Sequence, residues 1–121
     1  MGYHVIDPDD LESAPDRPSD MRSVSEDAGM NEMGLRLYRV QPGEDIPFGL
    51  HYHDQQEEAF YVVAGELRVE TPDREYRVTE GEFFIAEPKS PHRAYNAPSY
   101  DTTTVVVGMG APQADDAHLV K

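Results

Sequence analysis

Three histidines and a pair of glutamates have the types and spacing of ligands for a transition metal. His51 and His53 lie two positions apart, Glu57 and Glu58 follow closely, and His92 comes later in the chain. Imidazole nitrogens and carboxylate oxygens at short, fixed spacings are what proteins use to hold a divalent ion. The chain has only five His, so a group of three is more than a random distribution would give. We therefore expect a metal site here.

β-Strands must position these side chains. From Gly34 onward, short segments rich in β-branched and aromatic residues alternate with turns that contain Gly and Pro. No segment has a convincing apolar stripe at the 3.6-residue period of a helix. Strands are expected at 35–40, 59–64, 67–70, 76–78, 83–86 and 102–108. Short strands at this spacing predict an all-β sandwich or barrel.

Strand geometry predicts which of these side chains meet. Successive side chains point to opposite faces of a strand, so His51 and His53 face the same way. In a small closed barrel the inward faces of all strands meet, so His92 on a later strand can face the same point.

The same alternation leaves the choice of glutamate open. If Glu57 points inward, the residues that follow it inward are apolar: Ala59, Tyr61 and Val63. If Glu58 points inward, Phe60 and Val62 point inward with it. Ala94 and Asn96 would share the opposite wall with His92, so the pocket-lining residues would be Phe60, Val62, Ala94 and Asn96. We expect Asn96 to bond the backbone at a turn and not to act as a ligand.

The spacing around the first two histidines resembles the cupin family, whose members are small double-stranded β-helix (jelly-roll) barrels. The first cupin motif reads His-x-His, three or four residues, Glu, six residues, Gly. Here His51, His53, Glu58 and Gly65 occupy those positions. The six-residue gap before Gly65 selects Glu58 over Glu57.

The second cupin motif reads Gly, five residues, Pro-x-Gly, two residues, His, three residues, Asn. Gly81, His92 and Asn96 occupy the first Gly, the His and the Asn positions of this motif, but Glu87 stands at the Pro position and Lys89 at the second Gly position. A glycine there normally adopts a positive φ. Lys89 therefore predicts either a re-routed turn or about 1 kcal/mol of local strain. The resemblance covers about residues 35–110.

The resemblance implies that one divalent transition metal is bound by His51, His53, Glu58 and His92. Four ligands on a six-coordinate ion leave about two positions open, whereas four on tetrahedral zinc leave none. Iron, manganese, nickel or copper is therefore favoured over zinc for a catalytic role.

Cupins with this arrangement include dioxygenases, decarboxylases, isomerases and other lyases. The chain has no Cys and no further His expected near the site, since His4 and His118 lie in the terminal segments. No catalytic residue besides the ligands is assigned. We expect metal-centred chemistry on a small oxygen-rich molecule, with a dioxygenase-like reaction as first choice and an isomerase or lyase as second. The alternative is a non-catalytic small-ligand sensor or binding module.

The charge of the chain limits its partners and its surroundings. Asp and Glu number 24 against 10 Lys and Arg, a net charge of −14, which would repel nucleic acid. No apolar run is long enough to span a membrane and no signal pattern begins the chain, so a cytoplasmic location is expected. Abundant carboxylates with sparse Lys resemble proteins of halophiles, because in roughly 1 M salt the screening length is about 3 Å.

Three segments are expected along the chain. Residues 1–33 form an acidic arm that is partly ordered or supplies an edge strand, for which Tyr3, Val5 and Ile6 are candidates, and it either packs on its own domain or exchanges with a second subunit. Residues 34–110 form the cupin barrel, and 111–121 a polar tail. One apolar sheet face of the barrel predicts a homodimer.

Overall fold

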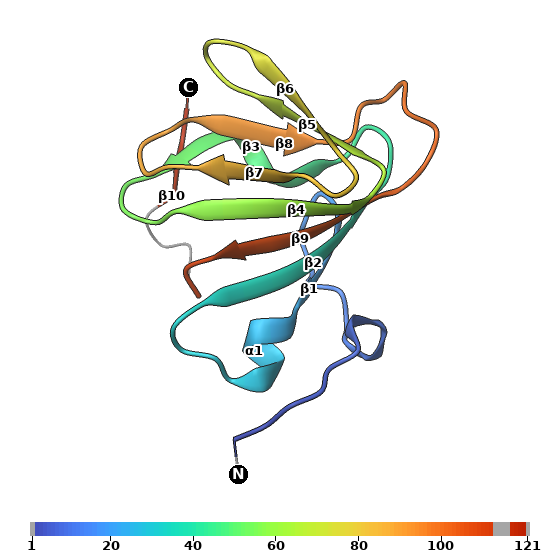
Figure 1. Ribbon diagram of the computed structural model, residues 1–121, viewed down its shortest axis with the longest axis vertical. Helices are drawn as coiled ribbons and strands as arrows, with labels where there is room; N and C mark the ends of the chain where they lie inside the picture. The colour runs from blue at the N-terminus through green and yellow to red at the C-terminus, as the bar shows by residue number, and fades with distance from the viewer. Residues whose placement is uncertain (1, 113–116, 121) are drawn as a thin grey trace.

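The computed structural model, which describes residues 2–112 and 117–120, consists of two antiparallel five-stranded sheets around one apolar core (Figure 1). The first sheet has the order β1 (Asp20–Ser23), β2 (Gly34–Val40), β9 (Thr104–Gly110), β4 (Glu58–Ala64) and β7 (Phe83–Ala86). The second has the order β10 (Ala117–Leu119), β3 (Asp45–His53), β8 (His92–Tyr95), β5 (Glu66–Glu70) and β6 (Glu75–Thr79). This architecture confirms the predicted all-β jelly-roll barrel.

The core forms because alternate side chains of both sheets point between them. In β4, Phe60 and Val62 are fully buried, whereas Val63 is exposed. Val106 in β9 and Ala94 in β8 are fully buried as well. The face of β4 that points inward is therefore the one that begins with Glu58.

Gly65 ends β4 in a turn that no other residue would adopt easily. Its φ is +86°, a left-handed conformation in which a side chain is strained. A Cβ at this position would also lie 2.7 Å from Oγ1 of Thr104. This tight turn sends the chain from the first sheet to β5 of the second.

The N-terminal arm is partly built into the first sheet. It contains a 3₁₀ turn, η1 (Pro8–Asp10), then β1 on the edge of β2, then the short helix α1 (Val24–Ala28). The Arg22 guanidinium donates hydrogen bonds to the carbonyls of Pro8 and Leu11, which ties the start of the arm to β1. The edge strand thus lies at residues 20–23, while Tyr3 and Val5 are exposed.

The C-terminal tail also contributes a strand, because β10 pairs with the end of β3, opposite His51 and His53. The boundaries at 33/34 and 110/111 stay predictions. In the part of the chain that the structure describes, no helix is long and apolar enough to cross a membrane.

Candidate metal centre

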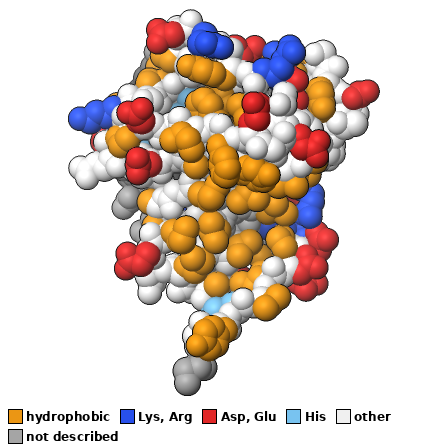
Figure 2. All heavy atoms as spheres, viewed as in Figure 1, with side chains coloured by type: hydrophobic (Ala, Val, Ile, Leu, Met, Phe, Trp, Pro, Cys, Tyr) orange, Lys and Arg blue, Asp and Glu red, His pale blue; other side chains and the backbone are white. Residues whose placement is uncertain are grey.

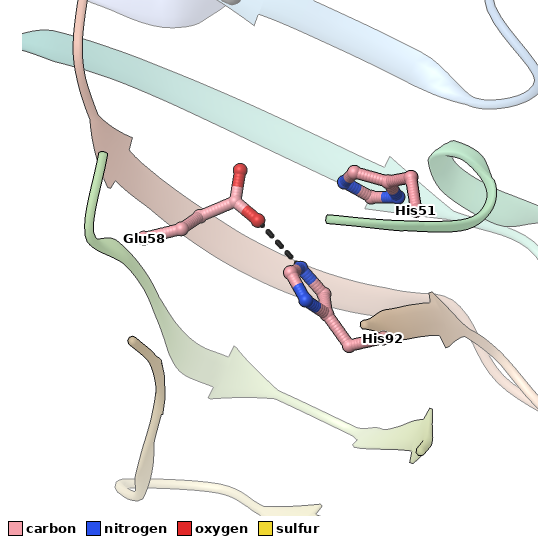
Figure 3. A group of neighbouring side chains, drawn as sticks. All are labelled: His51, Glu58 and His92. Carbon is pink, nitrogen blue, oxygen red and sulfur yellow. Dashed lines mark hydrogen bonds and ion pairs between the residues drawn. The ribbon is translucent and has the colours of Figure 1, made fainter. Parts of the chain in front are cut away.

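The candidate ligands come from three strands that end or begin at the same end of the barrel. His51 and His53 lie in the last three residues of β3, Glu58 begins β4, and His92 begins β8. β3 and β8 pair in the register that sets His51 opposite His92. Glu58 reaches them from the other sheet, so the site bridges both layers of the fold (Figure 3).

Three of the four predicted ligands converge closely. His51, Glu58 and His92 each offer a ligand atom, and these atoms lie within 4.8 Å of one another. The rings of His51 and His92 have centroids 4.7 Å apart, and the Glu58 carboxylate points at His92 (Figure 3). Both rings are almost completely buried and Glu58 is largely so. By contrast, Glu57 is exposed. The glutamate at the site is therefore Glu58, the one that the cupin spacing selects.

Backbone carbonyls orient two of the rings as metal ligands. Nδ1 of His51 lies 2.9 Å from the carbonyl oxygen of Gly49, and Nδ1 of His92 lies 2.9 Å from that of Ser90. A carbonyl oxygen only accepts, so each Nδ1 carries the proton. This is how proteins commonly hold a metal-binding imidazole, with Nε2 left to meet the ion.

His92 has an oxygen acceptor beside both ring nitrogens. Its Nδ1 faces Ser90, and its Nε2 lies 2.7 Å from Oε1 of Glu58. With Glu58 ionised, only a doubly protonated ring, or a neutral ring with a cation at Nε2, satisfies both oxygens at once. A buried carboxylate with two imidazoles is also a donor set suited to divalent transition metals. The residues present therefore fit a metal ion.

His53 lies beside the site with a different orientation. Its Nε2 is 3.5 Å from Oε2 of Glu58, while its Nδ1 is 3.1 Å from Nε2 of Gln56. The backbone N–H of Ala111 donates to Oε1 of Gln56 at 3.0 Å, which turns the amide nitrogen of Gln56 toward His53. Nδ1 of His53 is then an acceptor, and the proton of the neutral ring sits on Nε2. Ligation through that Nε2 requires the Gln56 amide to turn, so His53 as fourth ligand stays a prediction.

The electrostatics favour a negative charge on Glu58. Burial by itself would raise the pKa of this carboxyl group, but hydrogen bonds from His53 and His92, and the charge of those rings, outweigh burial and lower the pKa to about 2. Burial lowers the pKa of His51, helped by the neighbouring His92 and His53 and opposed by the Gly49 carbonyl and Glu58. An ionised carboxylate beside a largely neutral His51 is the state that a cation would meet.

A cavity of about 630 Å³ reaches the site from the side of the barrel. It runs between β6 and β7, and His92 is among the residues that line it, together with Tyr76 and Phe84. The four residues predicted to line the pocket are buried in the core, and their lining role stays a prediction: Phe60, Val62, Ala94 and Asn96. Asn96 donates hydrogen bonds to the carbonyls of Val40 and Thr102, the backbone role expected for it.

Sequence reasoning did not single out Tyr76 and Phe84, two of the aromatic residues that line this cavity, although their strands were predicted. Tyr76 pairs with the buried Val69, and Phe84 pairs with the buried Phe60. Cross-strand partners share one face of a sheet, so both rings are on inner faces. The alternation in 76–78 and the apolar run at 83–86 were visible, but the edge position of both strands was not.

The turn before His92 carries the strain expected from the sequence. Lys89 has a φ of +66°, so it adopts the left-handed conformation of the family's glycine and the turn is not re-routed. In this conformation its backbone N–H donates to the carbonyl of His53 at 2.6 Å. The turn thereby links the strand of the first two histidines to the strand of the third.

The two terminal histidines lie away from the three converging ligands. His4 is exposed. His118 in β10 is also exposed, contacts Asp54 at 2.8 Å and stacks on Tyr52. Tyr52 therefore packs on the outside of the barrel, on the opposite face of β3 from the site.

The comparisons with known proteins agree with this fold. The polyketide cyclase RemF from Streptomyces resistomycificus superposes with a TM-score of 0.81 over 98% of this chain and 86% of that one, at 18% identity. A predicted oxalate decarboxylase from Thermotoga maritima has a TM-score of 0.76 over 89% and 98% of the two chains, at 16% identity. A candidate sugar phosphate isomerase from Acidithiobacillus ferrooxidans has a TM-score of 0.69 over 77% and 58%, at 24% identity.

These identities are low, so the structures show the fold alone, and the chain spans little more than half the length of the Acidithiobacillus protein. No protein with a curated description matches the sequence. The family model described as the cupin domain matches residues 36–108, which is more than half of the 121 residues. The chain therefore belongs to the cupin family.

Proposed function

We propose that this protein is a metal-dependent enzyme that acts on a small oxygen-rich molecule. One divalent transition metal would be held by His51, Glu58 and His92, with His53 as the fourth ligand. The observation that carries the proposal is the position of His92. Its two nitrogens each face an oxygen, and the same ring lines a cavity large enough for a small molecule.

The side chains of the site have defined tasks in this proposal. The bound ion would act as a Lewis acid toward oxygen atoms of the ligand. The Gly49 and Ser90 carbonyls hold two imidazoles in the tautomer that exposes Nε2. Glu58 supplies the negative charge that makes a cation favourable in a buried place. Phe60 and Phe84, whose rings lie about 6 Å from that of His92, shield it from water.

Two reaction classes follow from this arrangement. Dioxygenase-like chemistry is the first expectation from the sequence, since the chain has no Cys and its other histidines are exposed. Isomerase or lyase chemistry is supported by the descriptions of structural neighbours, which include a cyclase and a predicted decarboxylase. A sensor that binds the same class of molecule without turnover is the alternative.

One experiment separates these outcomes. The protein is loaded in turn with Fe²⁺, Mn²⁺, Ni²⁺, Cu²⁺ and Zn²⁺, and its metal content is measured beside that of His92→Ala. We expect about one ion per chain, lost in the variant. Loaded protein is then given oxygen-rich substrates with and without O₂. Turnover only with O₂ indicates a dioxygenase, turnover without it an isomerase or lyase, and tight binding without turnover a sensor. Failure to retain any metal would refute the proposal.

A homodimer is the second part of the proposal, and the outer face of the first sheet supports it. On that face, with the exception of Arg39 in β2, the side chains across β2, β9, β4 and β7 are apolar and at least partly exposed: Leu35, Leu37, Val105, Val107, Met109, Ala59, Tyr61, Val63, Phe83 and Ile85. In Figure 2 apolar side chains run through the middle of the molecule, with acidic groups mostly toward its margins.

A second copy is the partner that suits this apolar face. Two chains of net charge −14 repel wherever carboxylates meet, and this face lets them pair without such contacts. Light scattering should give a dimer mass. Val107→Glu, at the centre of the face, should give a monomer, whereas Gln55→Glu, outside it, should not. A monomeric native protein would refute the dimer.

A further inference from the structure

We propose that the cavity beside His92 takes a flat aromatic molecule whose oxygen atoms point toward the metal centre, and that it discriminates against phosphorylated ligands. This inference rests on the proposed metal site and names the ligand class for it. The inference rests on the position of the cavity and on the rings and charges of its wall.

The cavity is a slot between two strand edges. β6 ends the second sheet and β7 ends the first, so among the described residues neither has a strand on its outer side (Figure 1). Residues of both strands line the slot, and so do the turns before β6 and before β8.

Aromatic rings lead through the slot to the candidate metal centre. The ring centroids of Tyr76 and Phe84 are 5.6 Å apart in an edge-to-face arrangement. Phe84 in turn lies 6.1 Å from the ring of His92. The Arg74 guanidinium lies over the Tyr76 ring at 4.4 Å, which holds that ring in place at the mouth. Rings at these separations can receive another ring by stacking or edge contact.

The charges of the slot oppose a phosphate group. Three acidic residues line it, Asp73, Glu82 and Glu87, against two basic ones, Arg77 and Lys89. Arg77 already lies 3.5 Å from the carboxylate of Glu66. A phosphate dianion in the slot would therefore be repelled by an excess of carboxylates and by the net charge of −14 of the whole chain. An uncharged or singly charged ring avoids this repulsion.

The test uses two ligands with the same metal-binding group. Benzohydroxamate and acetohydroxamate bind a metal through the same two oxygens, and only the former has a ring. Titration calorimetry on nickel-loaded full-length protein should show benzohydroxamate binding about 10-fold more tightly, because two aromatic contacts are each worth a few-fold in affinity. Glucose 6-phosphate should bind more weakly than either.

The variants Tyr76→Leu and Phe84→Leu keep apolar volume and remove one ring each. Both together should reduce the preference for benzohydroxamate to about 2-fold or less, measured as the ratio of the two hydroxamate dissociation constants on nickel-loaded protein. Because Phe84 packs against the core, Tyr76→Leu alone is also measured, and it should lower the preference about threefold.

Two failures are distinguishable. Protein that takes up no nickel, or binds neither hydroxamate, contradicts the proposed metal site. Loaded protein that binds both hydroxamates equally, keeps its preference in the variants, or binds glucose 6-phosphate more tightly overturns the ligand class alone.

Discussion

Gln56→Glu should strengthen metal binding, although the side chain itself is not a predicted ligand. In the native chain the Gln56 amide accepts from Ala111 and presents its nitrogen to Nδ1 of His53. That contact keeps the proton of His53 on Nε2, the atom that would ligate. A glutamate in the same place has two acceptor oxygens, one for Ala111 and one for an Nδ1–H of His53, so Nε2 is released for the ion.

The magnitude follows from the hydrogen bonds involved. Without the substitution, His53 can ligate only if the Gln56 amide turns and the partly buried N–H of Ala111 loses its acceptor, which costs about 1–3 kcal/mol. A carboxylate partner removes that cost, and outer partners of metal-binding histidines typically change affinity by about 10- to 100-fold. We therefore expect the dissociation constant for Ni²⁺ or Mn²⁺ to fall by roughly tenfold or more.

The assay is competition with a fluorescent chelator at constant ionic strength. Gln55→Glu adds the same negative charge on the neighbouring exposed residue and serves as the control for long-range attraction. Gln56→Ala removes the contact without offering a new acceptor and should not reach the affinity of Gln56→Glu. The reasoning would be refuted if Gln56→Glu bound the metal no more tightly than Gln55→Glu.

Three further predictions concern stability. Lys89→Gly should exceed Lys89→Ala in the free energy of unfolding by about 1 kcal/mol in chemical denaturation, since both remove the charge but only Gly relieves the left-handed backbone; equal stabilities would contradict the strain. In metal-free protein the ionised Glu58 should stabilise the fold at pH values above its unfolded-state pKa of 4.5, and this stabilisation should be lost as the pH falls through about 2. The decrease in the free energy of unfolding caused by Glu58→Gln should therefore become smaller in acid, and a decrease that does not depend on pH would contradict this prediction. If the chain is halophilic, its melting temperature should rise between 0.1 and about 2 M KCl as its net charge of −14 is screened, and a lower melting temperature in high salt would exclude that origin.

Local sequence determined a large part of the barrel and of the site. Two-residue alternation set His51 and His53 on one face, and β-rich segments between Gly and Pro turns marked most of the strands, because a strand's period depends only on its own residues. The cupin spacing selected Glu58, whose carboxylate the structure sets 2.7 Å from His92. The motif placed Lys89 at a glycine position, where either a re-routed turn or a strained backbone was expected, and the structure shows the left-handed backbone.

Only the tertiary structure decided the parts that depend on contacts between distant segments. Gln56 meets Ala111 across 55 positions of sequence, and that contact sets the tautomer of His53. Tyr76 and Phe84 line the cavity because β6 and β7 are edge strands of different sheets. Residues 20–23 and 117–119 form edge strands because they pair with strands elsewhere in the chain. Periodicity indicates on which face of its own strand a residue lies. The order of the strands, and the residues that meet across neighbouring strands, are decided only when the sheets pack.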